Sequence, residues 1–244
     1  MPRILITNDD GISAPGIHAL EASLARIGDV YVVAPLHEQS AASRRITLRK
    51  PFRFEMRGKN RYAVDGTPAD CSMMALTMLL DFKPDLVVSG INNGPNLGEN
   101  VYYSGTVAGA AEGAKYGIPA IAMSVNQRDD IDYGPAADFA MKIARQTLEC
   151  GLPAGIALNV NVPHPSYHGV AVTRQSGRLS RNLMIETQDP YGRPYYWMHE
   201  EIPIHDAEPG SDYAAVRDGK VSITPLRFDH TAHDVIESLQ GFEE

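Results

Sequence analysis

Two adjacent carboxylates follow the first apolar run of the chain. Asp9 and Asp10 come directly after residues 4–7, a short run that predicts a buried strand. Neighbouring carboxylates repel each other unless a positive charge neutralises them, and hard oxygen ligands suit Mg²⁺, Mn²⁺ or Ca²⁺ better than zinc. A solvated turn in which Asn8 and Asp9 cap the next helix would use the same residues. This motif alone leaves both interpretations open.

Polar residues also follow the next two predicted strands. Ser40 lies after the second apolar run, and Asn92 lies after the third. Because the carboxyl ends of parallel strands meet at one edge of a sheet, we expect these residues to converge on one crevice with the two aspartates. Serine and asparagine are neutral oxygen ligands. Together with Asp9 and Asp10 they could hold a divalent ion without repelling an anionic substrate.

The segment that begins at Ser104 predicts a phosphate site. Ser104, Gly105 and Thr106 open a small-residue helix over 105–116, and the N-terminus of a helix offers N–H donors and about half a positive charge. A serine cap is also common in helices that bind nothing. Beside a metal site, however, the pattern indicates a phosphoryl group held between cation and helix, as metal-assisted hydrolysis requires. The chain has no G-x-G-x-x-G, P-loop or G-x-S-x-G motif.

Apolar runs and helical patterns alternate through the first two thirds of the chain. This alternation predicts an α/β fold, a Rossmann-like, mostly parallel, doubly wound sheet flanked by helices. Thr67, Pro68 and Asp70 form the start signal of one of these helices. The expected strands are 4–7, 30–35, 86–89, 120–125 and 156–161, and the expected helices are 17–27, 68–79, 105–116 and 136–150.

Two regions depart from this alternation within what we expect to be a single domain, 1–244. The core is expected over 1–163, with an excursion at 36–66 that we interpret as projecting β-hairpins. Residues 164–244 are expected to form extended arms that pack against another subunit, followed by a short final helix. Within them, the runs 213–216 and 221–224 around Asp218-Gly219 predict a hairpin.

A group of histidines and aspartates near the end of the chain has the spacing of a metal cluster. Its members are Asp229, His230, His233 and Asp234. Capping of the final helix by Thr231 and Asp234 explains the same residues, and we favour that interpretation. Arg44, Arg45 and the basic residues after them could attract an anionic substrate, but solubility of an exposed hairpin is the simpler explanation.

Composition excludes several classes of protein. The 22 Lys and Arg against 30 Asp and Glu give a net charge of −8, which argues against a nucleic-acid polymer or an anionic membrane as partner. The beginning of the chain has no signal-peptide pattern. The cysteines, Cys71 and Cys150, are expected to be buried hydrophobes in helices, as in a reducing compartment. A cytoplasmic location is therefore expected.

Motifs spread over nearly the whole chain resemble the SurE survival-protein family. The pairing of the N-D-D-G turn with S-G-I-N-x-G-x-N is the most specific part of this resemblance. The motifs are residues 8–11, 32–35, 66–68, 89–92, 94–98, 103–106, 188–190 and 222–225.

The resemblance implies a metal-dependent 5′-nucleotidase. Members of the family hydrolyse nucleoside 5′-monophosphates and sometimes 3′-monophosphates, and form homodimers or homotetramers with exchanged carboxyl-terminal arms. One divalent ion per subunit, Mg²⁺ or Mn²⁺, is implied. Carried over to this sequence, the metal ligands are Asp9, Asp10, Ser40 and Asn92; the phosphate-binding residues are Asn8, Asn96, Ser104, Gly105 and Thr106; and the catalytic residues are Asp9 and Asn96.

Two alternatives use the same site. One is a broad phosphatase of small substrates that also acts on short polyphosphate, as some members of the family do. The other is a metal-dependent nucleotide-binding sensor that does no chemistry. The two carboxylates favour an enzyme, because a pure phosphate binder gains nothing from added negative charge.

Overall fold

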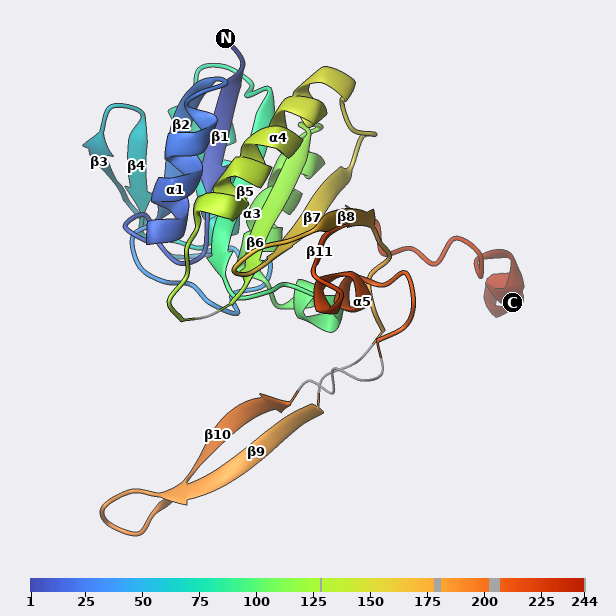
Figure 1. The fold of residues 1–244 in the computed structure, drawn as a ribbon. Coiled ribbons are helices and arrows are strands. Elements are labelled where there is room, and N and C mark those ends of the chain that lie inside the picture. Colours follow the sequence, from blue (N-terminus) through green and yellow to red (C-terminus); the bar gives the residue numbers. More distant parts are fainter. Residues whose placement is uncertain (128, 178–180, 202–206, 244) are drawn as a thin grey trace.

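A mixed, mostly parallel sheet of nine strands organises the chain (Figure 1). The computed structural model describes residues 1–127, 129–177, 181–201 and 207–243. The strand order is β3-β4-β2-β1-β5-β6-β7-β11-β8. The strands of this sheet are β1 (Arg3–Thr7), β2 (Asp29–Pro35), β3 (Phe54–Gly58), β4 (Arg61–Val64), β5 (Leu86–Asn93), β6 (Ala120–Asn126), β7 (Ile156–Pro163), β8 (Gly169–Val172) and β11 (Lys220–Arg227).

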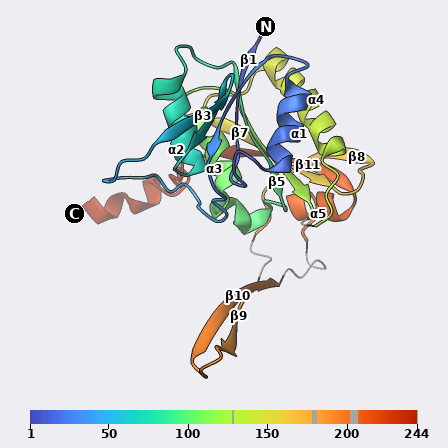
Figure 2. The same ribbon diagram turned by 90° about the vertical axis from the view of Figure 1, so that its left-hand side faces the viewer.

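Helices cover both faces of the sheet, which confirms the predicted α/β class. Figure 2 shows α1 and α4 on one side and α2 and α3 on the other. Successive residues of β1 point to opposite faces, so Ile4 and Ile6 pack under α1 and α4 while Leu5 packs under α2 and α3. The helices are α1 (Pro15–Leu24), α2 (Pro68–Met74) with a π-helical turn at Ala75–Leu79, the 3₁₀ helix η2 (Gly98–Tyr102), α3 (Gly105–Lys115), α4 (Gly134–Cys150), α5 (Asp212–Arg217) and the 3₁₀ helix η4 (Glu237–Glu243).

Strand β1 lies at the point where the strand order reverses. It pairs in parallel with β2 on one side and with β5 on the other. The chain therefore leaves β1 toward one edge of the sheet and later returns to its opposite neighbour. In open α/β sheets the crevice at the carboxyl ends of such strands binds ligands. The Asn8–Gly11 turn and the residues after β5 meet there.

Helix α3 approaches the sheet unusually closely because its contact face consists of glycines. A Cβ at Gly109 would lie 2.7 Å from Thr7 Cγ2, and one at Gly113 would lie 2.7 Å from Val87 Cγ2. At the first turn, a Cβ at Gly105 would lie 2.8 Å from the Cβ of Asp9. The spacing of four residues places all three glycines on one face of the helix. This face brings the N-terminus of α3 against the turn after β1.

The excursion at 36–66 differs from the predicted projecting hairpins. Strand β4 pairs in parallel with β2, so the single hairpin β3–β4 continues the sheet at its edge. Strand β5 extends to Asn93 and is therefore longer than the expected strand 86–89. The capping box at Thr67 is confirmed, because Thr67 and Asp70 hydrogen-bond reciprocally at the start of α2.

The carboxyl-terminal third contains two elements that the sequence patterns miss. Residues 213–216 belong to helix α5, where Ser211 caps the N-terminus and Asp218-Gly219 ends the helix instead of forming a hairpin turn. The second element is β9 (Arg181–Gln188), which pairs with β10 (Pro194–Glu201) in a separate antiparallel hairpin. Figure 1 shows this hairpin projecting from the sheet, as expected of an arm, whereas β8 and β11 join the sheet itself. The predicted arm region also includes 178–180, 202–206 and 244, which lie outside the described residues.

The final segment also departs from its prediction. Asp229, not Asp234, organises the turn, since its carboxylate accepts hydrogen bonds from the Thr231 N–H and from His233 Nε2. The 3₁₀ helix η4 begins only at Glu237. No cluster of three potential metal-binding His, Cys, Asp or Glu side chains occurs in the described part of the chain, at this segment or elsewhere.

The two cysteines have different environments. Cys71 is buried in α2, as expected, but Cys150 is exposed because it is the last residue of α4. Among the described residues, no helix is long and apolar enough to cross a membrane.

The glycine face of α3 makes a prediction about stability. In an ordinary helix, replacing glycine by alanine is favourable by about 0.5–1 kcal/mol. Gly109→Ala should instead lower the free energy of unfolding by about 1–3 kcal/mol, because its methyl group must displace Thr7 and Ser89. Urea unfolding measures the change. Gly241→Ala, whose Cβ would meet nothing within 4 Å, is the control. Equal stability of Gly109→Ala and the wild type would contradict the close approach of α3.

Candidate active site at the carboxyl end of the first strand

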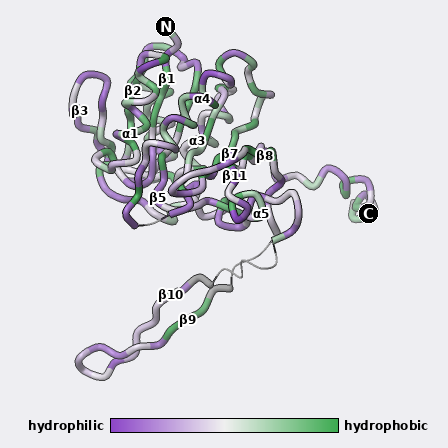
Figure 3. Tube along the Cα trace, viewed as in Figure 1, coloured by the Kyte–Doolittle hydropathy of each residue, from purple (hydrophilic) through white to green (hydrophobic). Residues whose placement is uncertain are grey.

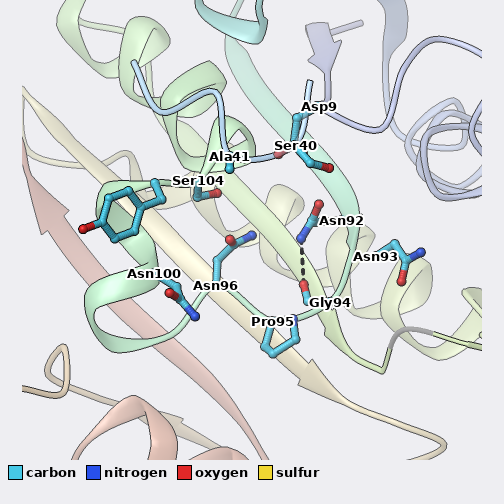
Figure 4. A pocket seen from close by; sticks show the side chains of 11 residues that line it. Asp9, Ser40, Ala41, Asn92, Asn93, Gly94, Pro95, Asn96, Asn100 and Ser104 are labelled. Carbon is cyan, nitrogen blue, oxygen red and sulfur yellow. Dashed lines mark hydrogen bonds between the residues drawn. The ribbon is translucent and has the colours of Figure 1, made fainter. Parts of the chain in front are cut away.

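A polar pocket of about 260 Å³ opens at the predicted crevice (Figure 4). Its walls come from the turn after β1, the loop after β2, the segment from the end of β5 through η2, and the cap of α3. The lining residues are Asp9, Ser40, Ala41, Asn92, Asn93, Gly94, Pro95, Asn96, Asn100, Tyr103 and Ser104. The structure therefore brings together residues that the sequence places up to 95 positions apart, as the parallel topology predicts.

Asp9 lies at the inner wall of the pocket and is only 5% exposed. The Thr106 hydroxyl donates a hydrogen bond to Asp9 Oδ1, and the start of α3 packs on its side chain through Gly105. Burial, together with the neighbouring charge of Asp10, raises the pKa of Asp9 to about 6 in spite of the hydrogen bond from Thr106. The proton of the Thr106 hydroxyl is thus used to orient Asp9.

Asp10 faces a second pocket on the other side of the same turn. Its Oδ2 atom accepts a hydrogen bond of 3.1 Å from the Asn93 N–H. Burial and the nearby charge of Glu38 raise the pKa of Asp10. This second pocket, of about 410 Å³, also contains Tyr133. Asp9 and Asp10 therefore belong to one turn, but their side chains line pockets on different sides of it.

The donor set fits a divalent cation. Burial disfavours the charged forms of Asp9 and Asp10, as does a neighbouring carboxylate in each case, Asp10 for Asp9 and Glu38 for Asp10; within the described ranges neither forms an ion pair with a lysine or arginine. Asn92 donates through Nδ2 to the Gly94 carbonyl, which leaves its amide oxygen free, and Figure 4 shows that oxygen turned toward Asp9 and Ser40. Carboxylate, amide and hydroxyl oxygens are the ligands that Mg²⁺ and Mn²⁺ prefer.

Ser104 is the donor best placed for an anion. As the cap of α3 its hydroxyl oxygen accepts from the Val107 N–H at 3.0 Å, and its own proton has no acceptor among the described residues, so it can donate to a ligand in the pocket. Gly105 contributes backbone at the same helix start. Asn8, also predicted at the phosphate, is fully buried, and its amide donates to the Gly11 carbonyl at 2.8 Å. It therefore holds the turn and does not line the pocket.

Asn96 is held by a buried network that sequence reasoning missed. Its backbone N–H donates to Asn161 Oδ1 at 2.8 Å, and its carbonyl accepts from Asn159 Nδ2 at 2.7 Å. Its side-chain amide donates to Ser124 Oγ at 2.9 Å. The available signal is the alternation of asparagine with valine in β7, because an asparagine in a strand buried on both faces needs a partner.

Fold and site together define a class of protein. The chain is an α/β protein with a carboxylate-containing pocket at the switch point of a mostly parallel sheet, closed by the N-terminus of a helix. This arrangement is suited to binding a cation and an anion side by side.

Comparisons with known proteins assign the family. A family model described as "Survival protein SurE" matches residues 4–182, and the chain belongs to this family. It is 46% identical to the 5′-nucleotidase SurE of Geotalea daltonii, with 99% of both chains covered. It is 47% identical to the protein of the same name from Moorella thermoacetica, covering 98% of this chain and 95% of that one. The crystal structure of the SurE protein from Aquifex aeolicus superposes with a TM-score of 0.91 at 42% identity, over 100% of both chains.

The donor set predicts that a divalent cation stabilises the folded protein. At a concentration about 100 times its dissociation constant, a bound ion adds about 2.7 kcal/mol to the free energy of unfolding, which raises Tm by about 5–10 °C. Mn²⁺ or Mg²⁺ added to the stripped protein should produce such a shift, and Asp9→Asn should remove it. Asp218→Asn, which changes an exposed carboxylate outside the pocket, should keep the shift. Equal shifts in both variants would exclude the pocket as the cation site.

Proposed function

We propose that this chain is a divalent-metal-dependent 5′-nucleotidase that removes phosphate from nucleoside 5′-monophosphates. The observation that carries the proposal is that the buried Asp9 and the capping Ser104 line one pocket. A cation-binding carboxylate beside an anion-binding helix start is what metal-assisted phosphoryl transfer needs. The names of relatives at 46–47% identity support the same substrate class.

In this proposal Asp9, Asp10, Ser40 and Asn92 hold one divalent ion per subunit, Mg²⁺ or Mn²⁺. When bound, the ion supplies neutralisation of the carboxylates and polarisation of the phosphoryl oxygen and of the attacking water. The chemistry of the donors supports this set, since all four provide oxygen ligands. Asp10 belongs to the proposed set because it follows Asp9 in the same turn, although its carboxylate lines the second pocket in this structure.

The chain's own groups bind and orient the phosphate. Ser104 donates its hydroxyl proton to a phosphoryl oxygen, and the N–H of Gly105, the first residue of α3, has no partner within the helix and can donate beside it. Asn96 also donates, from the segment of the wall that leads to Ser104. Thr106 acts through Asp9, because its hydroxyl hydrogen bond fixes the carboxylate. Asp9, so oriented, accepts the proton of the attacking water as general base.

The proposal predicts metal-dependent release of phosphate from AMP. Protein stripped of metal should release no phosphate from AMP, and added Mn²⁺ or Mg²⁺ should restore turnover. Asp9→Asn should lower kcat about 10³-fold or more, because it removes several kcal/mol of transition-state stabilisation. Phosphate assay at saturating metal measures the effect. Release that is equal in the variant and the wild type would contradict the assignment of Asp9.

Two further variants sharpen this experiment. Ser104→Gly removes the hydroxyl but keeps a residue that caps helices well, so it should lower kcat/KM for AMP about 10²-fold with little loss of stability. Asp218→Asn should leave turnover unchanged.

The same assay also tests the two alternative functions, a broad phosphatase and a sensor. Equal specificity constants for AMP, sugar phosphates and polyphosphate indicate a broad phosphatase, and AMP binding without phosphate release indicates a sensor.

We also propose that the protein is a homodimer or homotetramer in the cytoplasm, with arms packed on neighbouring subunits. Large apolar side chains on the projecting β10, Tyr196, Trp197 and Met198, are each at least 60% exposed, and Figure 3 shows a hydrophobic stretch in its partner β9. Exposed apolar surface of this kind favours association. Light scattering should give two or four times the subunit mass of 26.6 kDa, and a monomer at micromolar concentration would contradict it.

A further inference from the structure

Gly98 is the first residue of η2, and both of its backbone polar groups hydrogen-bond side chains from much later in the chain. The Gly98 N–H donates to Asp212 Oδ2 at 2.8 Å, and the Gly98 carbonyl accepts from Gln175 Nε2 at 2.7 Å. Gly98 adopts a φ of +51°, and a Cβ there would lie 3.0 Å from the ring of Tyr213. We call Asp212, Gln175 and Gly98 the clamp. The backbone of Gly98 is thus bound through both of its polar groups.

The two carboxylate oxygens of Asp212 have separate partners. Oδ1 accepts from the N–H and the hydroxyl of Ser176 and from the N–H of Tyr213, whereas Oδ2 accepts from Gly98. Asp212 is 0% exposed, so each of these hydrogen bonds forms away from water. A buried carboxylate is costly unless donors surround it. The cluster therefore forms as a unit, and Oδ2 is the carboxylate oxygen that hydrogen-bonds η2.

The clamp lies within the segment that lines the active-site pocket. Asn96 precedes Gly98, and Asn100 and Ser104 follow it in the same wall. Within this segment the Leu97 carbonyl accepts from the Asn100 N–H, and the Asn100 carbonyl accepts from the Ser104 N–H at 3.0 Å. These hydrogen bonds connect the clamp to the cap of α3 without a break.

The other side of the clamp is the base of the β9–β10 hairpin. The backbone carbonyl of Arg174, next to Gln175, accepts from the Asp212 N–H at 3.0 Å, and the Arg174 backbone N–H donates to the Gly210 carbonyl at 3.1 Å. An ion pair between Arg174 and Glu208 adds to this closure. The segments that precede and follow the hairpin in the sequence are therefore hydrogen-bonded to each other beside the two residues that bind Gly98.

We propose that Asp212 and Gln175 are positioning residues for the phosphate-binding wall, acting through Gly98. The inference rests on the proposed function. Asn96 and Ser104 must be held precisely against the substrate, since a displacement of about 1 Å in an active site can cost about 10²-fold in rate. The proposed cation ligands lie elsewhere, Asp9, Asp10 and Ser40 on other loops and Asn92 in strand β5, so release of the clamp disturbs phosphate binding and leaves cation binding intact.

The experiment compares variants that release the clamp with one that spares it. Asp212→Asn, with its amide nitrogen at the Oδ2 position, removes the acceptor for Gly98 and keeps the contacts of Oδ1. Gln175→Met removes the other side of the clamp at nearly constant side-chain length. Ser176→Ala is the control, because it removes a hydrogen bond from the same buried cluster without touching Gly98.

Both clamp variants should raise KM for AMP at least fivefold and lower kcat/KM about 10²-fold, while the Mn²⁺-induced shift in Tm is retained. Amide exchange over residues 97–104 should be faster than in the wild type. Ser176→Ala should keep KM within twofold even where its Tm falls. Partial unfolding removes active enzyme without changing the KM of the remainder, so KM separates positioning from stability.

Unchanged KM and unchanged exchange in a folded Asp212→Asn or Gln175→Met would overturn the inference, as would parallel losses in Ser176→Ala. If Asp212→Asn does not fold, Gln175→Met decides the question by the same readouts. Wild-type protein that releases no phosphate from AMP would refute the proposed function itself. The two failures are therefore distinguishable.

Discussion

The close contact between helix α3 and strands β1 and β5 is the constraint on which the site depends. Glycines at three successive turns of α3 allow its backbone to lie directly on Thr7, Ser89 and Val87. Any side chain at these positions would push the helix outward and separate Ser104 from Asp9. Because interiors pack at the density of organic crystals, such a shift cannot be absorbed locally. The small residues of α3 therefore determine how close an anion bound at Ser104 lies to the Asp9 carboxylate.

Burial determines the electrostatics of the pocket around Asp9. Asp9 is enclosed by the helix and by the sheet, and burial raises its pKa, so a cation is a natural partner for its charged form. Around it the pocket offers neutral amides and hydroxyls, which can bind a cation and a phosphate without favouring one charge alone. Asn159, Asn161 and Ser124 extend this polar region into the sheet, where each of them hydrogen-bonds Asn96. The fold thus accommodates buried polar groups by pairing them.

The carboxyl-terminal third of the chain contributes to the main sheet and contacts the wall of the pocket. Strand β11 continues the sheet beside β7, and α5 carries Asp212 to the start of η2. One wall of the pocket is therefore supported by residues 114 positions later in the chain. This gives a physical reason for the similarity to relatives to extend over nearly the whole chain, since one wall of the pocket is hydrogen-bonded to residues beyond position 163.

Local patterns in the sequence determined the strands and helices of the core, the capping box at Thr67 and the small-residue helix after Ser104, because these depend on neighbours within a few positions. They also indicated that Asp9, Ser40, Asn92 and Ser104 converge, since parallel strands share an edge. Only the tertiary structure decided the rest. Residues 213–216 have a strand-like composition but form a helix, because Ser211 caps it and its Asp212 binds distant backbone. Likewise Thr106 faces Asp9, and Asp10 opens to a second pocket, because these orientations follow from contacts between segments that no local pattern contains.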